Sequence, residues 1–143
     1  MDKQFVMAGL VKAKTQGLVE KIGVSVYEPE EALKAVVDSR VDIIQIPYNV
    51  LDKRLNKVGF FDKVKETKKE IYARSALLQG LLLMHPSDAD RRVPSSGQWV
   101  AQFQSIIQAY GYTPLEAAML YSFCHVIKRL DMKRDFVLML KKC

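Results

Sequence analysis

The stretch of sequence that decides the fold is residues 21–75, KIGVSVYEPEEALKAVVDSRVDIIQIPYNVLDKRLNKVGFFDKVKETKKEIYARS. Three short runs within it, at 21–27, 42–46 and 71–75, are rich in β-branched residues and predict strands. The segments between these runs repeat apolar residues at helical spacing, and Pro29 followed by glutamates is typical of a first helical turn. This β-α-β-α-β order predicts an α/β fold, a parallel sheet with helical crossovers.

The flanking sequence adds further elements. Three further helices are predicted, one before this stretch over 5–14 and two after it, over 99–110 and from 113 onward. Thr113 and Glu116 have the spacing of a capping box. Residues 85–90, HPSDAD, are predicted to form a loop, and residues 135–139 a fourth strand. The helix from Pro29 is predicted to bury Ala32, Leu33, Val36 and Val37. No composition shift or internal repeat divides the chain, so residues 1–143 are predicted to form one domain.

The composition excludes several classes of protein. Hydrophobic residues make up 49% of the 143 and charged residues 27%, which is typical of a globular domain. No apolar run approaches the roughly 20 residues that cross a bilayer, and the N-terminus lacks the features of a signal peptide. We therefore expect a soluble, cytoplasmic protein that binds no membrane. The net charge of +6 comes from basic residues spread among acidic ones, so no nucleic-acid binding is expected.

No metal site is predicted. The two cysteines, Cys124 and Cys143, are too few for a disulfide framework or a four-cysteine zinc site. Cys124 and His125 are neighbours on a predicted helix, where side chains point about 100° apart, and no third ligand accompanies them. His85 and His125 are interpreted as surface or packing residues.

Four motifs carry a resemblance to a known family. They are 22–27 with 29–31, 42–49 with 51–55, 73–75 with 78–82, and 112–118. In this order and spacing they resemble the fifth strand and helix, the sixth strand and its loop, the seventh strand and its turn, and the seventh helix of the aldo-keto reductases. The resemblance runs from about Phe5 to Met139. It implies strands 5 to 8 of an eight-stranded (β/α) barrel, which typically needs ~250 residues. The expected fold is therefore a half-barrel with three to four parallel strands.

The resemblance implies a rim for NADPH. Ser25 and Gln45 match family positions that hold the nicotinamide carboxamide, and Arg74 stands where many members have a tyrosine stacked on the nicotinamide. The turn that contacts the pyrophosphate side supplies Ser75, Leu77, Gln79 and Leu81. Independently, polar residues at the carboxyl ends of parallel strands lie where ligands bind such folds. The alternative is that these polar groups form hydrogen bonds only with one another or with water. We favour this alternative for a half-barrel, so weak or absent NADPH binding is expected.

The resemblance does not supply catalytic residues. The family's proton-donating tyrosine, with its aspartate, lysine and histidine, lies on the first four strands, and none of the matched positions corresponds to these residues. No catalytic residue is therefore predicted, and the chain is interpreted as an aldo-keto reductase-like fragment that is inactive alone. Two alternatives stay open. One is the cofactor-binding half of a split NADPH-dependent oxidoreductase that a complementary N-terminal half completes. The other is a non-enzymatic interaction or scaffold domain.

Half of a barrel has two exposed strand edges and an uncovered apolar face. Such surfaces favour association, so a homo-oligomer is expected, with a dimer favoured. A flatter α/β layer is an alternative, because the curvature of strands in a barrel depends on closure.

Overall fold

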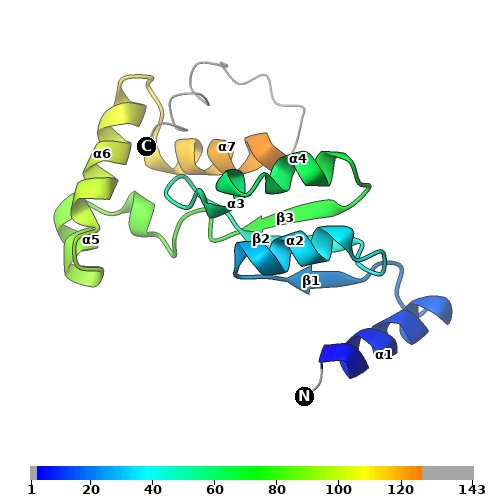
Figure 1. Cartoon of the computed structure of the whole chain (residues 1–143). Coiled ribbons are helices and arrows are strands. Elements are labelled where there is room, and N and C mark those ends of the chain that lie inside the picture. Colours follow the sequence, from blue (N-terminus) through cyan, green and yellow to red (C-terminus); the bar gives the residue numbers. More distant parts are fainter. Residues whose placement is uncertain (1–2, 127–143) are drawn as a thin grey trace. The chain divides into compact units, whose positions relative to one another are not determined.

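The computed structural model describes residues 3–126 of the chain (Figure 1). The strands are β1 (Gly23–Ser25), β2 (Ile43–Pro47) and β3 (Glu70–Arg74). The helices are α1 (Lys3–Thr15), α2 (Pro29–Val37), α3 (Arg54–Lys57), α4 (Phe60–Lys65), α5 (Pro86–Arg92), α6 (Gly97–Gln108) and α7 (Pro114–Val126), with a 3₁₀ turn η1 (Leu81–Leu83). The prediction of an α/β fold with three parallel strands and flanking helices is confirmed.

The sheet has the order β1-β2-β3. β1 and β2 are parallel, with Val24 beside Ile44. Because β2 is the middle strand, Ile44 and Ile46 are fully buried, as expected for a strand that a helical layer covers. The described residues divide into two compact units, one from 3–46 and 54–72 and the other from 47–53 and 73–126.

In the first unit, α2 buries a face that differs slightly from the prediction. Ala32, Ala35 and Val36 are buried, whereas Val37 is 79% exposed and was wrongly placed on the inner face. Residues at i, i+3 and i+4 share one face of a helix, so Ala35 takes the inner position and Val37 turns outward. Leu33 is half-buried.

In the second unit, two tyrosines form the centre of the packing. Tyr48 and Tyr121 are buried and stack with ring centroids 5.3 Å apart. The predicted capping box of α7 is confirmed. The Thr113 N–H donates to Glu116 Oε2 at 2.9 Å, and the Glu116 N–H donates to Thr113 Oγ1 at 3.3 Å. These bonds satisfy backbone donors that the first helical turn leaves without a partner.

The predicted loop at 85–90 is wrong, because these residues begin α5. The Ser87 N–H donates to His85 Nδ1 at 3.4 Å, and Pro86 occupies the first turn, where its missing N–H costs nothing. Ala89 is fully buried, and its carbonyl accepts a bond from Ser96 Oγ at 2.8 Å. Proline, serine and aspartate favour turns, but the same residues also start helices, and here burial of Ala89 decides between them.

Some predictions fall outside the described residues. The predicted strand at 135–139 lies there, as does Cys143. The backbone of Cys124 and His125 belongs to α7. Within residues 3–126, no helix is long and apolar enough to cross a membrane.

Asp38 and Arg40 form an ion pair at the C-terminal end of α2. Arg40 donates from Nε to Asp38 Oδ1 at 2.9 Å and from a terminal nitrogen to Oδ2 at 2.6 Å. These hydrogen bonds from the Arg40 side chain and backbone lower the pKa of Asp38 from 3.8 to about 2. A depressed carboxyl pKa stabilises the folded state above the unfolded pKa, and this contribution disappears as the pH falls through the folded pKa.

We predict that Asp38→Asn lowers the free energy of unfolding at neutral pH by at most ~1 kcal/mol, because the pair is partly exposed to solvent. The difference from the wild-type chain should shrink between the ordinary pKa of 3.8 and the folded value of about 2, where the wild-type carboxylate is itself protonated. Urea unfolding at several pH values measures this difference. A deficit that is the same at every pH would contradict the assignment to charge.

Candidate functional site

The open face of the sheet holds the first two predicted rim residues side by side. Ser25 on β1 is paired with Gln45 on β2. Ser25 Oγ donates to Gln45 Oε1 at 3.0 Å, and both side chains are exposed. Ile44 and Ile46 point to the buried side of β2, so strand alternation places Gln45 on the opposite side. The parallel register therefore brings together two polar groups that lie 20 residues apart in the sequence.

Sequence reasoning missed a third member of this row, Tyr72. The Glu70 N–H donates to the Asp42 carbonyl at 2.9 Å, which sets β3 beside β2 with Tyr72 next to Gln45. Tyr72 is 52% exposed, so its ring is accessible on the open face of the sheet. The available signal was its position two residues before Arg74, because alternate residues of a strand share one face.

Arg74 ends β3 and is half-buried. Its carbonyl accepts a bond from the Tyr48 N–H at 3.0 Å, which anchors the end of the strand. Strand alternation places the Arg74 side chain on the same face as Tyr72. A guanidinium is planar and can stack on a flat ring, so this position offers a stacking surface at the carboxyl end of the strand.

The turn after β3 has an unusual backbone. Ser75, Leu78 and Gln79 have positive φ values of 61°, 49° and 54°, and Gly80 follows with a φ of 87°. Successive turn bonds hold this conformation, from the Leu78 N–H to the Ser75 carbonyl at 3.0 Å and from the Gly80 N–H to the Leu77 carbonyl at 2.9 Å. Residues other than glycine seldom adopt the left-handed region, and such strain gathers at functional sites. The turn is therefore a fixed structural feature that directly follows β3.

The side chains of the turn differ in what they can offer to a ligand. Leu81 is buried against Ala89 and Val100, so a ligand would meet its backbone and not its side chain. Gln79 is exposed, and its carbonyl accepts a bond from an Arg92 terminal nitrogen at 3.2 Å. Leu77 is half-buried. The contribution of this turn to binding a phosphate would thus come mainly from backbone groups.

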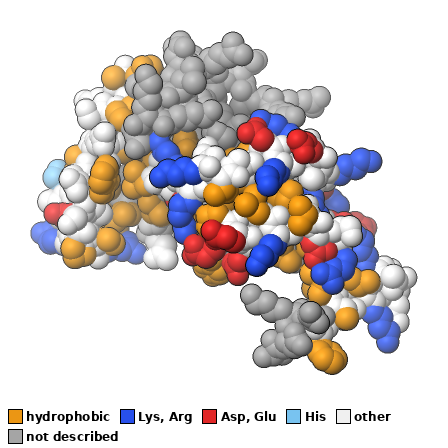
Figure 2. All heavy atoms as spheres, in the orientation of Figure 1, with side chains coloured by type: hydrophobic (Ala, Val, Ile, Leu, Met, Phe, Trp, Pro, Cys, Tyr) orange, Lys and Arg blue, Asp and Glu red, His pale blue; other side chains and the backbone are white. Residues whose placement is uncertain are grey.

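The other candidate groups have structural surroundings. His85 accepts the bond that begins α5, and its Nδ1 also lies 2.9 Å from Ser87 Oγ. Among residues 3–126, no cluster of three or more histidine, cysteine, aspartate or glutamate side chains could hold a metal ion. On the face shown in Figure 2, Lys and Arg side chains lie beside Asp and Glu and do not form one basic surface.

Comparison with known protein families gives a match for this chain. The model of the aldo/keto reductase family matches residues 3–139, which is nearly the whole chain. No curated protein matches the chain.

Proposed function

Because the chain belongs to the aldo/keto reductase family, we propose that it is the strand-5-to-8 half of that family's barrel and that it has no reductase activity alone. β1, β2 and β3 then correspond to strands 5, 6 and 7. An α/β unit with three parallel strands and flanking helices is consistent with such a partial barrel. The assignment makes the chain an oxidoreductase-like fragment, which we place in the cytoplasm.

The proposed inactivity rests on the four matched motifs. Tyr72 lies in a row with Gln45 and Ser25, and Arg74 stands on the same face of the sheet. Lys21 also interacts electrostatically with Tyr72. The family's tyrosine, lysine, aspartate and histidine belong to the first four strands, and the four matched motifs contain none of them. Tyr72 lies outside the four matched motifs, so we propose that it does not serve as a proton donor.

A single observation carries the proposal of weak cofactor binding, the 3.0 Å bond from Ser25 Oγ to Gln45 Oε1. NADPH would supply hydride chemistry when bound, and Ser25, Gln45 and Arg74 would hold its nicotinamide. A carboxamide that binds here must compete with the bond that the two side chains already make. A hydrogen bond that replaces an existing one contributes little net free energy. NADPH affinity at this rim is therefore weak or absent.

An assay of NADPH oxidation tests the inactivity of the purified chain. With aromatic and aliphatic aldehydes as substrates, we expect no loss of reduced nicotinamide beyond the rate without protein. A matched Tyr72→Phe variant serves as the control. Turnover that the wild-type chain shows and Tyr72→Phe loses would contradict the proposal, because Tyr72 would then act as the proton donor.

A further inference from the structure

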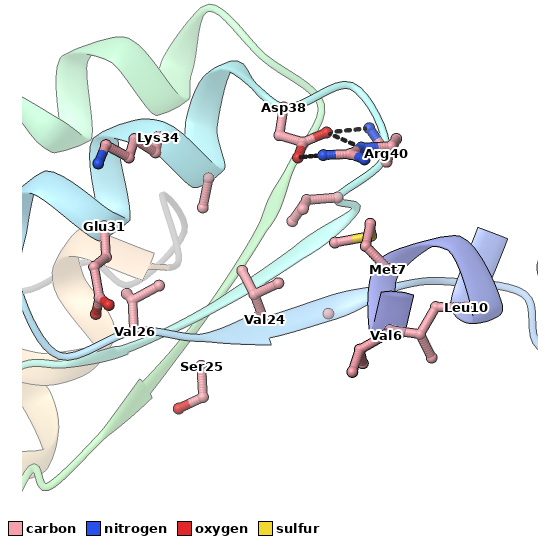
Figure 3. A pocket seen from close by; sticks show the side chains of 13 residues that line it. Val6, Met7, Leu10, Val24, Ser25, Val26, Glu31, Lys34, Asp38 and Arg40 are labelled. Carbon is pink, nitrogen blue, oxygen red and sulfur yellow. Dashed lines mark hydrogen bonds and ion pairs between the residues drawn. The ribbon is translucent and has the colours of Figure 1, made fainter. Parts of the chain in front are cut away.

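A groove of about 680 Å³ runs along the outer edge of the first unit (Figure 3). Val24 and Val26 of β1 line it together with Ala35 of α2, and Met7 and Leu10 of α1 line the other end. Most of the exposed lining is apolar, and the charged side chains of Glu31, Lys34, Asp38 and Arg40 also line the groove. An apolar groove beside a strand can hold the side chains of an added strand.

β1 is an outer strand of the described sheet, and alternate residues of it face away from β2. The Ile43 N–H donates to the Ile22 carbonyl at 3.1 Å, and the Val26 N–H donates to the Gln45 carbonyl at 3.0 Å. In a parallel ladder, every second residue of a strand directs its N–H and its C=O toward the same neighbouring strand. Ile22, Val24 and Val26 therefore direct theirs toward β2. The backbone groups of Gly23 and Ser25 therefore point to the outer edge, where a further strand can pair.

The edge of β1 has only some of the features that keep strand edges apart. Natural edges are protected by short length, charged residues, prolines or bulges, and β1 is short, with three residues. Residues 22–27 read IGVSVY and contain neither a charge nor a proline. β3, the other outer strand of the described sheet, carries Glu70 and Arg74. The contrast between the two strands indicates that the β1 edge is suited to pairing.

We propose that β1 pairs with β1 of a second copy of this chain, antiparallel about a two-fold axis at Val24. Gly23 then forms a hydrogen-bonded pair with Ser25 of the second copy, and Ser25 forms one with Gly23 of the second copy. Val24 meets its own equivalent in a pair without backbone bonds, where side chains approach most closely. Ile22 faces Val26 of the second copy, so every side chain on the groove side meets an apolar partner.

Neighbouring registers are less favourable. An axis at Gly23 would set Val26 against Glu20, and an axis at Ser25 would set Ile22 against Glu28. Both arrangements set a carboxylate directly opposite an apolar side chain, which loses the apolar partner that it has with the axis at Val24. With the axis at Val24, Lys21 falls opposite Tyr27, and the pairs from 22 to 26 carry no charge. Glu20 of each copy meets Glu28 of the other beyond these pairs, where both side chains are exposed to solvent. The uncharged pairs at 22–26 therefore favour a second copy as the occupant.

A cysteine at the axis tests this register. In a background with Cys124→Ser and Cys143→Ser, Val24→Cys should form a cross-linked dimer with oxidised glutathione as the oxidant. The α-carbons of such a pair lie about 4.5 Å apart, within the range of a disulfide. Ser25→Cys is the matched control. Its α-carbon would lie about 7–8 Å from its equivalent, so it should not cross-link. Cross-linking of Ser25→Cys in preference to Val24→Cys would overturn the register.

A charge exchange tests the pairing without a covalent bond. Light scattering should give twice the 16.3 kDa chain mass for the wild type and one chain mass for Val24→Lys or Val24→Glu alone. Like charges meet at the axis in each variant, and an equal mixture of the two should restore the dimer. A wild-type mass of one chain, or a dimer that both variants retain, would overturn the proposal. The pairing does not depend on the proposed inactivity, so either can fail while the other stands.

Discussion

Replacing Phe60 with alanine should lower the free energy of unfolding by about 3–5 kcal/mol, a large part of the stability of a small domain. Phe60 begins α4 and is fully buried. Its ring meets that of Phe61 edge to face, with centroids 5.2 Å apart. α4 packs against α2, so truncation of Phe60 would leave a cavity inside the first unit. The cost combines the lost burial of the ring with the cavity that remains.

The neighbouring ring provides the control for this prediction. Phe61 is only half-buried, so Phe61→Ala removes the same atoms with a smaller loss of burial. Urea unfolding of both variants compares the two positions directly. Equal losses at Phe60 and Phe61 would contradict the packing of α4 described above.

Replacing Gly97 with alanine should cost about 1–3 kcal/mol, because an added methyl group would overpack the contact between α5 and α6. A Cβ at Gly97 would lie 2.6 Å from the Pro86 carbonyl oxygen and 3.1 Å from Asp90 Cγ. The first atom belongs to the backbone, so it cannot turn aside. The Gly97 N–H also donates to Asp90 Oδ1 at 2.9 Å, and this bond holds the two helices in place.

Gly9 in α1 is the matched control for Gly97→Ala. A Cβ at Gly9 would meet no atom within 4 Å, and alanine is the better helix former by roughly 1 kcal/mol. Gly9→Ala should therefore leave the unfolding midpoint unchanged or raise it. If Gly97→Ala proves as harmless as Gly9→Ala in urea unfolding, the close approach of α5 and α6 is wrong.

The sequence predicted those helices and strands in which the pattern of apolar residues matches the residues that are buried in the structure. The three strands follow from β-branched runs between turn formers, and α2 follows from Pro29, its glutamates and its apolar spacing. α5 escaped prediction because its first residues are also turn formers, and the burial of Ala89 is a tertiary effect. Val37 was misplaced because the apolar pattern does not tell which of the adjacent residues Val36 and Val37 is buried. In the folded chain Val36 is buried and Val37 is exposed.

The candidate site was predictable only in part, because it depends on register. The sequence indicates that Ser25 and Gln45 lie near the carboxyl ends of strands, but their mutual bond requires the pairing of β1 with β2. Tyr72 enters the row through the alignment of β3 with β2, which no local pattern reports. The positive φ values at Ser75, Leu78 and Gln79 were not predictable either, because residues of these types seldom adopt the left-handed region.

Calorimetric titration of NADPH into the purified chain tests the central claim most directly, with Arg74→Ala as the matched variant. Binding in the millimolar range corresponds to about −4 kcal/mol and binding in the micromolar range to about −8 kcal/mol, so the two results are well separated. We predict no saturation at micromolar NADPH and the same weak heats for the wild type and Arg74→Ala. Saturable micromolar binding that Arg74→Ala weakens would contradict the account, because the rim would then hold the cofactor without the other half of the barrel.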